Sequence, residues 1–438
     1  MKIAIVLGTR PEIIKMSPVI DEIESQNIEL VLIHTGQHYD SEMSDQFFLE
    51  LELPTPNFNI GVGSGSHGQQ TGKMMEGIEE VLVEEKPDML LVQGDTNAVL
   101  AGALVASKLH IPVGHVEAGL RSFDDTMPEE INRKTADICS NLYFVPTTQS
   151  AINLAIEGIS RYKIAITGNT VVDACFRNLK IAEKRLKSAV SSDLQNLLDL
   201  DNILTLTMHR AENVDNKERV INIINALEQL KDLNIIFPIH PRTANRLKEF
   251  NLFDKLKNLE NVHLIKPVGY LDFLLLQSKS LLILTDSGGL QEEAITLNIP
   301  ALTLRYNTER PETVSEGGNI LVGSNTENIV KMANKILNNK DFSDKMKSAK
   351  NPYGDGDSGK QIIDIILNSY NNGKLKIDSP SDIMINSSSK IAVINEDTTV
   401  SDFEKENNAL IQIIYNKNDI EFPEDNINLK DKFILYSS

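Results

Sequence analysis

A short apolar segment that runs directly into Asp-Ser-Gly-Gly and then into a helix can bind an anion. This pattern occupies residues 281–297, with Ser287, Gly288 and Gly289 at the junction. Glycine lets the backbone approach a ligand closely, and the first N–H groups of a helix have no internal partner, so they can donate to phosphate oxygens. Glu293 follows about a turn and a half later, where a carboxylate can accept both hydroxyls of a ribose. The segment therefore predicts a nucleotide site, and the alternative is an ordinary strand-to-helix turn.

Three carboxylates occupy positions suited to acid/base chemistry. Asp95 follows an apolar run in QGDTN, Glu117 ends the next run in GHVEAGLRS, and Glu129 belongs to the PEE segment that opens a helix. Because the carboxyl ends of neighbouring parallel strands meet at one edge of a sheet, we expect the three side chains at one crevice. Carboxyl groups in such a crevice can exchange protons with a substrate. Taken singly, each is more often a helix cap or part of a structural ion pair.

Four basic side chains accompany these acids. Arg10 and Lys15 follow the first apolar run in KIAIVLGTRPEIIK, where Pro11 occupies a position typical of a helix start. His209 and Arg210 end the first apolar run of the second half, in LTMHRAEN. All four are candidates to contact phosphate or sugar. The alternatives are solvated surface cations and a histidine packed in the core.

The motifs typical of dinucleotide and metal sites fail on their context. Residues 63–68 spell GxGxxG but follow a proline-rich loop instead of an opening strand, so they do not indicate dinucleotide binding. The eight histidines show no metal-ligand spacing with cysteine or acidic residues. The sequence thus predicts neither a cofactor nor a metal ion.

Short apolar runs alternate with amphipathic helical segments, a rhythm that predicts parallel sheets covered by helices. The runs of the first series begin at Lys2, Leu30, Met89, Val113, Leu142 and Lys163, and those of the second begin at Ile203, Asn234, Val262, Leu281 and Ala301. We expect an α/β fold with two Rossmann-like domains, residues 1–170 and 171–373, and a ligand cleft between them. Residues 374–438 are acidic and rich in asparagine, and we expect them to form an appendage.

The composition limits the class of protein. The 438 residues carry 43 basic and 62 acidic side chains, a net charge of −19 that opposes nonspecific binding to nucleic acid or anionic membranes. No apolar run reaches membrane-spanning length, and no leader-like segment precedes the first strand. Because Cys139 and Cys175 are the only cysteines, we expect a reduced, cytoplasmic protein.

Taken together, the motifs resemble those of the non-hydrolysing UDP-N-acetylglucosamine 2-epimerases, and archaeal-type members in particular. The matching segments are GTRPEIIK, QGDT, GHVEAGLRS, PEEINR, ITGNTVVDA, LTDSGGLQEEA, TERPE and NPYGDG, and the resemblance covers residues 1 to about 370. It implies two Rossmann-like domains of the glycosyltransferase-B type. It also implies a homodimer that interconverts UDP-N-acetylglucosamine (UDP-GlcNAc) and UDP-N-acetylmannosamine (UDP-ManNAc).

The resemblance assigns roles to individual residues. The acid/base set that it implies is Asp95, Glu117 and Glu129, with His209 at the diphosphate and sugar. The substrate-binding set is Arg10, Lys15, Arg210, Phe273, Ser287, Gly288, Gly289, Glu293 and Arg310, with Phe273 where the family contacts the uracil. Gln37 and His38 match part of a second UDP-GlcNAc site that activates bacterial members.

The chemistry implied is elimination and re-addition of UDP. The hydrogen on C2 of the sugar has no neighbouring carbonyl to acidify it, whereas C1 carries a good leaving group. The resemblance implies that UDP departs as C2 loses its proton, giving 2-acetamidoglucal, and that UDP returns as C2 is reprotonated from the other face. Charge then grows on the diphosphate in an oxocarbenium-like transition state, where cations and helix starts can stabilise it.

Two other functional classes remain open on the sequence. A hydrolysing epimerase or a retaining glycosyltransferase would use the same nucleotide half but release or transfer the sugar. A catalytically silent protein would bind the nucleotide sugar and do no chemistry. The retained acids and His209 favour the epimerase.

Overall fold

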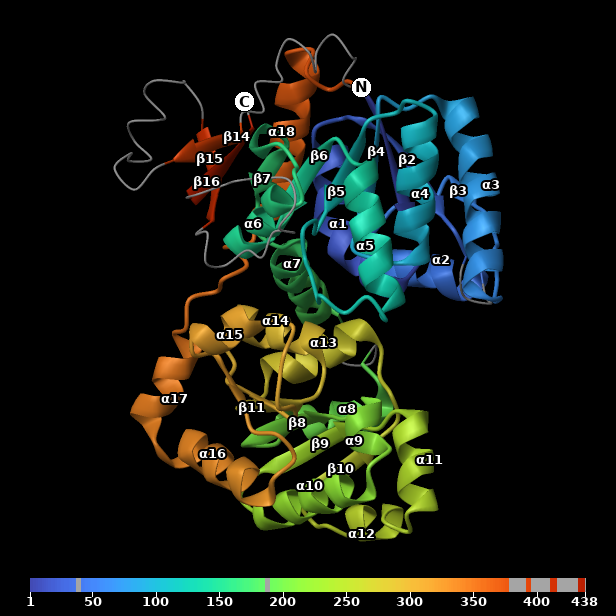
Figure 1. Ribbon diagram of the computed structural model, residues 1–438. Coiled ribbons are helices and arrows are strands. Elements are labelled where there is room, and N and C mark those ends of the chain that lie inside the picture. The colour runs from blue at the N-terminus through green and yellow to red at the C-terminus, as the bar shows by residue number, and fades with distance from the viewer. Residues whose placement is uncertain (37–40, 186–189, 378–390, 395–409, 416–431, 438) are drawn as a thin grey trace. The chain divides into compact units, whose positions relative to one another are not determined.

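The computed structural model describes the chain apart from residues 37–40, 186–189, 378–390, 395–409, 416–431 and 438 (Figure 1). The chain divides into two compact units. The first comprises Met1–Thr170 with Asp357–Ser438, and the second comprises Val171–Gly356. Each unit is built around its own parallel sheet, so the prediction of two parallel-sheet α/β domains is confirmed.

The first unit contains a parallel sheet with the strand order β3-β2-β1-β4-β5-β6-β7. The strands are β1 (Lys2–Leu7), β2 (Glu29–His34), β3 (Phe58–Asn59), β4 (Met89–Gln93), β5 (Val113–Val116), β6 (Leu142–Val145) and β7 (Ile164–Ile166). The chain starts in the middle of the sheet and builds outward in both directions. Because β1 and β4 are covered on both faces, they consist almost wholly of buried apolar residues.

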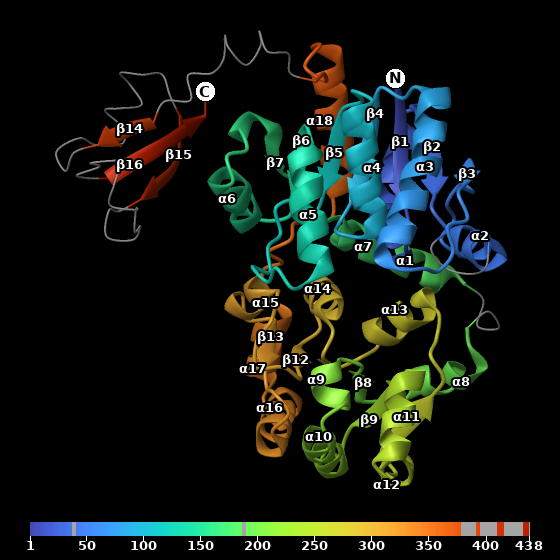
Figure 2. The same cartoon turned by 45° about the vertical axis from the view of Figure 1, so that its right-hand side comes forward.

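Helices cover both faces of this sheet. They are α1 (Arg10–Ser25), α2 (Ser41–Glu50), α3 (His67–Glu85), α4 (Asn97–Lys108), α5 (Pro128–Cys139), α6 (Thr148–Ile156) and α18 (Ser358–Asn371). Helices α3, α4 and α5 lie side by side on one face (Figure 2). Right-handed crossovers place α1 on the other face, where α18 packs against it although more than three hundred residues separate the two in sequence.

The second unit repeats the plan with the strand order β10-β9-β8-β11-β12-β13, again parallel. Its strands are β8 (Ile203–Thr207), β9 (Asn234–Pro238), β10 (Val262–Ile265), β11 (Leu282–Thr285), β12 (Ala301–Thr303) and β13 (Asn319–Leu321). Its helices are α7 (Thr170–Lys184), α8 (Ser192–Gln195), α9 (Ala211–Val214), α10 (Lys217–Gln229), α11 (Pro241–Glu249), α12 (Phe253–Lys257), α13 (Tyr270–Ser278), α14 (Gly288–Thr296), α15 (Pro311–Ser315), α16 (Thr326–Asn338) and α17 (Lys340–Lys347). Leucine and isoleucine side chains fill the core between this sheet and α10 and α16.

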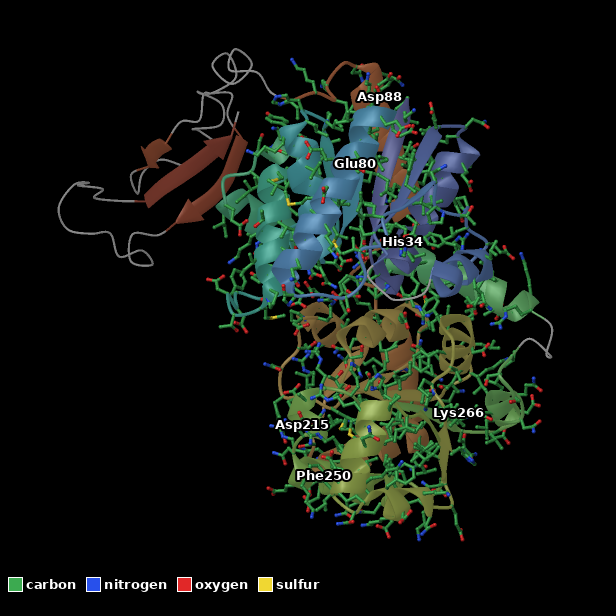
Figure 3. The ribbon with its side chains drawn as sticks, turned by 90° about the vertical axis from the view of Figure 1, so that its right-hand side faces the viewer. His34, Glu80, Asp88, Asp215, Phe250 and Lys266 are labelled. Atoms are coloured by element: carbon green, nitrogen blue, oxygen red, sulfur yellow. The ribbon has the colours of Figure 1, made fainter. Side chains whose placement is uncertain are left out.

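Figure 3 labels residues near both ends of the parallel strands in each sheet. The carboxyl edge of a sheet here means the side at which its parallel strands end, and the amino edge means the side at which they begin. In the first unit, Asp88 precedes β4 at the amino edge and His34 ends β2 at the carboxyl edge. In the second unit, Lys266 follows β10 at the carboxyl edge, and Phe250 follows α11 near the opposite one. The carboxyl edges matter because parallel sheets bind ligands in the loops that follow their strands.

Two further features lie outside this plan. The described part of the C-terminal extension contains an antiparallel sheet of β14 (Ile391–Ile394), β16 (Lys432–Ser437) and β15 (Leu410–Tyr415), in that order. Among the helices that the structure describes, none combines the length and the apolar character needed to cross a membrane.

The contact between α1 and α18 gives a first testable prediction. A Cβ at Gly359 would lie 2.9 Å from the backbone carbonyl of Pro18, so Gly359→Ala is expected to lower the free energy of unfolding. Forced contacts in a packed interior typically cost about 1–3 kcal/mol. The matched control is Gly72→Ala in α3, where a Cβ meets nothing within 4 Å and alanine should raise helix stability. Urea denaturation measures both, and an unchanged midpoint for Gly359→Ala would contradict the close α1–α18 contact.

Candidate active site

Asp95 lies in the turn between β4 and α4, at the carboxyl edge of the first sheet. Thr96, and not Asp95, caps α4, because its hydroxyl accepts a hydrogen bond from the Val99 N–H. The Asp95 carboxylate is paired with the Arg133 guanidinium of α5. Asn132, also on α5, donates to the Asp95 carbonyl oxygen at 3.0 Å. Asp95 is therefore not the helix cap but belongs to an ion pair, the other alternative that the sequence left open, and its side chain is 33% exposed at the sheet edge.

Glu117 follows β5 at the same edge and is only 8% exposed. Its Oε2 lies 2.6 Å from the Lys15 ammonium, and the Gln93 amide donates to the same oxygen at 2.5 Å. The residue has a φ of 67°, a left-handed conformation that is rare for a side chain of this size. Such strain is found most often at functional sites. The structure thus brings Lys15 and Glu117, which the sequence analysis named separately, into one ion pair.

The PEE segment places its two glutamates differently. Glu129 is exposed in the first turn of α5, and among the described residues no hydrogen-bond or ion-pair partner is found for it. Glu130 is fully buried and accepts hydrogen bonds from the Ser122 N–H and from Arg133. Burial opposes ionisation of Glu130, but the bonds from Ser122 and the charge of Arg133 hold its pKa below the ordinary value. Glu130 therefore anchors α5, whereas Glu129 is the carboxylate that solvent and ligand can reach.

Arg10 is the first residue of α1 and is exposed. Its guanidinium lies 5.2 Å from the centre of the Phe47 ring, a cation–π contact that orients the long side chain. The proposed activating residues Gln37 and His38 lie outside the described residues. Within the described residues, no cluster of His, Cys, Asp and Glu has an arrangement able to hold a metal ion.

Asp286 organises the carboxyl edge of the second sheet, and the sequence analysis did not name it as a site residue. It is fully buried, and its carboxylate accepts from the backbone N–H groups of His209 and Arg210 at 3.0 and 2.9 Å. The His209 Nδ1 lies 3.2 Å from the same carboxylate. The His209 side chain is otherwise 47% exposed, so its other ring nitrogen can meet a ligand. The sequence did contain a signal for this residue, because Asp286 directly follows an apolar strand and precedes Ser-Gly-Gly.

The Ser-Gly-Gly junction has the expected form of a strand-to-helix turn. Ser287 is the residue before α14, and its hydroxyl makes no capping bond to the helix. A Cβ at Gly289 would meet nothing within 4 Å, and one at Gly288 would meet only Glu309, at 3.7 Å. Packing within the protein does not require these glycines. Their lack of side chains leaves the backbone N–H groups of the helix start open to an approaching anion.

The two glutamates of α14 also have separate partners. Glu292 is 1% exposed and lies 2.5 Å from the Nε of Arg310, so this buried acid fixes the arginine. Glu293 is partly buried and accepts a hydrogen bond from the Gln277 amide at 2.7 Å. Phe273 is partly buried and packs against a small apolar cluster. Arg210 lies 3.6 Å from the Glu309 carboxylate, and Arg310 donates to the Glu309 carbonyl oxygen at 3.1 Å, so both arginines contact this residue.

Comparisons with known proteins show which family of enzymes this chain resembles. A family model described as UDP-N-acetylglucosamine 2-epimerase matches residues 21–367. A protein named UDP-N-acetylglucosamine 2-epimerase from Methanocaldococcus jannaschii is 56% identical over 369 residues, which is 84% of this chain and 99% of that protein. A UDP-2,3-diacetamido-2,3-dideoxy-D-glucuronate 2-epimerase from Pseudomonas aeruginosa is 42% identical over 342 residues. The match covers 77% of this chain and 92% of that protein.

A solved structure has the same fold. It is the UDP-GlcNAc 2-epimerase of Methanocaldococcus jannaschii in complex with UDP-GlcNAc and UDP, with a TM-score of 0.71 and 55% identity over 84% of this chain and 100% of that one.

Proposed function

This chain belongs to the UDP-N-acetylglucosamine 2-epimerase family, and from that premise we propose that it interconverts UDP-GlcNAc and UDP-ManNAc without releasing the sugar. One observation carries the proposal beyond nucleotide binding. Glu117 is a buried carboxylate in a strained conformation at a strand end, held by Lys15 and Gln93. Proton transfer at C2 requires an acid or base held beside the sugar, and a buried carboxylate fixed at a strand end is suited to that role.

The proposed reaction begins with loss of UDP. The bond between C1 and the phosphate oxygen breaks, and its electron pair leaves with UDP. The C2–H bond breaks as well, its electrons form the C1=C2 double bond of 2-acetamidoglucal, and a carboxylate takes the proton. Return of a proton to the opposite face of C2 and of UDP to C1 completes the inversion. Asp95, Glu117 and Glu129 are the proposed carriers of these protons.

The residues of the second unit are proposed to stabilise the leaving group. His209, held by Asp286, and the open N–H groups at the start of α14 meet the diphosphate as its negative charge develops. Glu293 accepts the ribose hydroxyls, and Arg310 contributes a fixed positive charge nearby. Arg10 and Lys15 supply positive charge from the first unit.

Separation of the nucleotide products tests this function. The protein is incubated with UDP-GlcNAc, and the mixture is resolved by anion-exchange chromatography. We expect UDP-ManNAc at equilibrium with UDP-GlcNAc, with no accumulation of UDP. Free ManNAc with stoichiometric UDP would indicate the hydrolysing reaction instead. The substrate named for the Pseudomonas aeruginosa relative is run in parallel, and faster turnover of that sugar would move the proposed specificity to it.

Nucleotide binding by the second unit is tested separately with UDP alone. Glu293→Ala is expected to weaken UDP binding about tenfold or more, since one charge-assisted hydrogen-bond partner contributes about 1.5–3 kcal/mol. Isothermal titration calorimetry measures the affinity. The control is Glu316→Ala, an exposed glutamate after α15. Equal UDP affinity for Glu293→Ala and the control would remove the ribose assignment.

We also propose that the protein is a homodimer. Light scattering measures the molar mass in solution and so tests this directly.

A further inference from the structure

Asp95 lies in a turn, Gly94–Thr96, whose two ends are held by buried ionisable side chains that the proposed reaction does not use. Glu12 of α1 contacts one end, and His115 of β5 contacts the other. Both side chains are almost completely buried, at 2% and 0% exposure. Ionisable groups are seldom buried in this way without a specific partner or purpose.

Glu12 receives only hydrogen-bond donors. Its Oε2 accepts from the Gly8 N–H at 3.1 Å and from the Thr9 hydroxyl at 2.7 Å. Its Oε1 accepts from the Thr96 hydroxyl at 2.8 Å. A carboxylate surrounded by donors is best satisfied when it is ionised. The side chain therefore ties the turn that carries Asp95 to the Gly8–Arg10 loop.

His115 contacts only hydrogen-bond acceptors. Its Nδ1 lies 2.7 Å from the Asp137 carboxylate, and its Nε2 lies 2.8 Å from the Gly94 carbonyl oxygen. Asp137 also receives the Arg121 guanidinium at 2.7 Å. Burial opposes ionisation of Asp137, but the charges of His115 and Arg121 and their hydrogen bonds hold its pKa below the ordinary value. The Gly94 carbonyl can only accept, so Nε2 donates to it, and Nδ1 donates to Asp137 when that carboxyl is ionised, an arrangement that fits an imidazolium.

We propose that Glu12 and His115 are positioning residues that clamp the Gly94–Thr96 turn from both ends and so fix the Asp95 carboxylate for proton transfer. The inference rests on the proposed function, because it assigns Asp95 a reaction. Neither side chain touches the substrate. On the turn itself, Glu12 acts through the Thr96 hydroxyl and His115 acts through the Gly94 carbonyl.

The pKa values of Glu12 and His115 are both raised in the folded protein, so both groups make the folded state less stable as pH rises. Burial raises the pKa of Glu12 to about 7, against the opposing bonds from Thr9, Thr96 and Gly8. Between its ordinary pKa of 4.5 and about 7 the folded protein keeps a proton that the unfolded chain has lost, so stability falls as pH rises through that window. Above about pH 7 Glu12 is ionised in the folded protein as well, and the folded state then carries the whole free-energy cost of that buried charge. Burial and the charge of Arg121 oppose ionisation of His115, but the charge and hydrogen bond of Asp137 and the bond to Gly94 raise its pKa, and its contribution to stability is lost as pH rises.

The first test replaces the charge at position 12. Glu12→Gln keeps the shape of the side chain, but only one of its terminal atoms can accept, so it cannot accept from Thr96 on one side and from Gly8 and Thr9 on the other as the carboxylate does. We expect kcat to fall by about ten- to a hundredfold, the size of effect seen when reacting groups are misplaced. The affinity for UDP and the KM should stay within about twofold, and the Tm at pH 8 should equal or exceed that of the wild type, because the buried charge is gone. Glu80→Gln, an exposed glutamate on α3 (Figure 3), is the matched control and should change none of these.

The second test addresses His115. His115→Asn cannot reach both Asp137 and Gly94, and we expect kcat to fall by a similar factor with UDP affinity unchanged. His110→Asn is the control, because His110 is exposed with a φ of 60°, a conformation that asparagine accepts. The ¹⁵N NMR spectrum of histidine-labelled protein, assigned with His115→Asn, should show both ring nitrogens of His115 protonated at pH 7.

The outcomes separate the clamp from the function on which it rests. Normal kcat in both variants, or a neutral His115 in the spectrum, would overturn the clamp while leaving the epimerase intact. A loss of kcat accompanied by an equal loss of Tm and UDP affinity would show that the residues are only structural, which also overturns it. A wild type that binds UDP but never forms UDP-ManNAc would instead refute the proposed function. The clamp is supported if the wild type is active and both variants have a lowered kcat while keeping their Tm and their affinity for UDP.

Discussion

Glu117→Gln is expected to lower the turnover of UDP-GlcNAc by about a hundredfold or more, the usual size of a general acid/base contribution. Glutamine fills the same space and can still contact Gln93 and Lys15, but it cannot accept the proton from C2. UDP affinity should change much less than turnover, because Glu117 itself is not among the residues proposed to contact UDP. Steady-state rates by chromatography and calorimetry with UDP measure the two properties.

Asp95→Asn and Glu129→Gln are expected to show losses of the same order. Their surroundings make the comparison informative, because Asp95 is paired with Arg133 whereas Glu129 is exposed. Glu80→Gln serves again as the control for loss of a surface charge. Near-normal turnover in all three acid variants would mean that the acid/base assignment is wrong. Near-normal turnover in Glu129→Gln alone would mean that Asp95 and Glu117, the two carboxylates that follow strands, carry out the proton transfer.

His209→Asn is the second change with a large expected effect. We expect turnover to fall by about a hundredfold, because one donor to a developing oxyanion contributes roughly 3 kcal/mol, while UDP affinity falls much less. The ring is held 3.2 Å from the buried Asp286 carboxylate, which keeps one nitrogen occupied and leaves the other for the diphosphate. Single-turnover rates and calorimetry with UDP are compared.

The same two measurements on His110→Asn control for the chemical change. If His209→Asn lost UDP affinity and turnover in equal proportion, the histidine would act in ground-state binding, and its role in the departure of UDP would be contradicted.

The sheet plan could be predicted from the sequence because each strand is a short, almost wholly apolar run. Every run that the sequence analysis named is a strand, with starts within one residue of those observed. Two strands of the parallel sheets were missed, β3 (Phe58–Asn59) and β13 (Asn319–Leu321). They are two and three residues long and lie at the edges of their sheets, where a strand needs little apolar surface.

The partners of the site residues could not be predicted, because they come from segments distant in sequence. Lys15 and Glu117 are 102 positions apart, and only the adjacency of β1, β4 and β5 brings them together. Arg310 pairs with Glu292, which the pattern Gln-Glu-Glu does not distinguish from Glu293. Asp286 was overlooked because its function, holding the loop at His209, depends on β8 and β11 being neighbours. Local patterns give elements and motifs, and tertiary packing selects which side chain of a motif faces inward.

Proton NMR of UDP-GlcNAc incubated with the protein in D₂O shows directly whether the bond between C2 and its hydrogen is broken and remade with solvent. We expect UDP-ManNAc to appear with deuterium at C2, and the C2 proton of the remaining UDP-GlcNAc to exchange as the mixture approaches equilibrium. Glu117→Gln, at matched concentration, should slow both signals together. Formation of UDP-ManNAc that retains the original C2 proton, or of free ManNAc in place of UDP-ManNAc, would contradict reversible elimination by this protein.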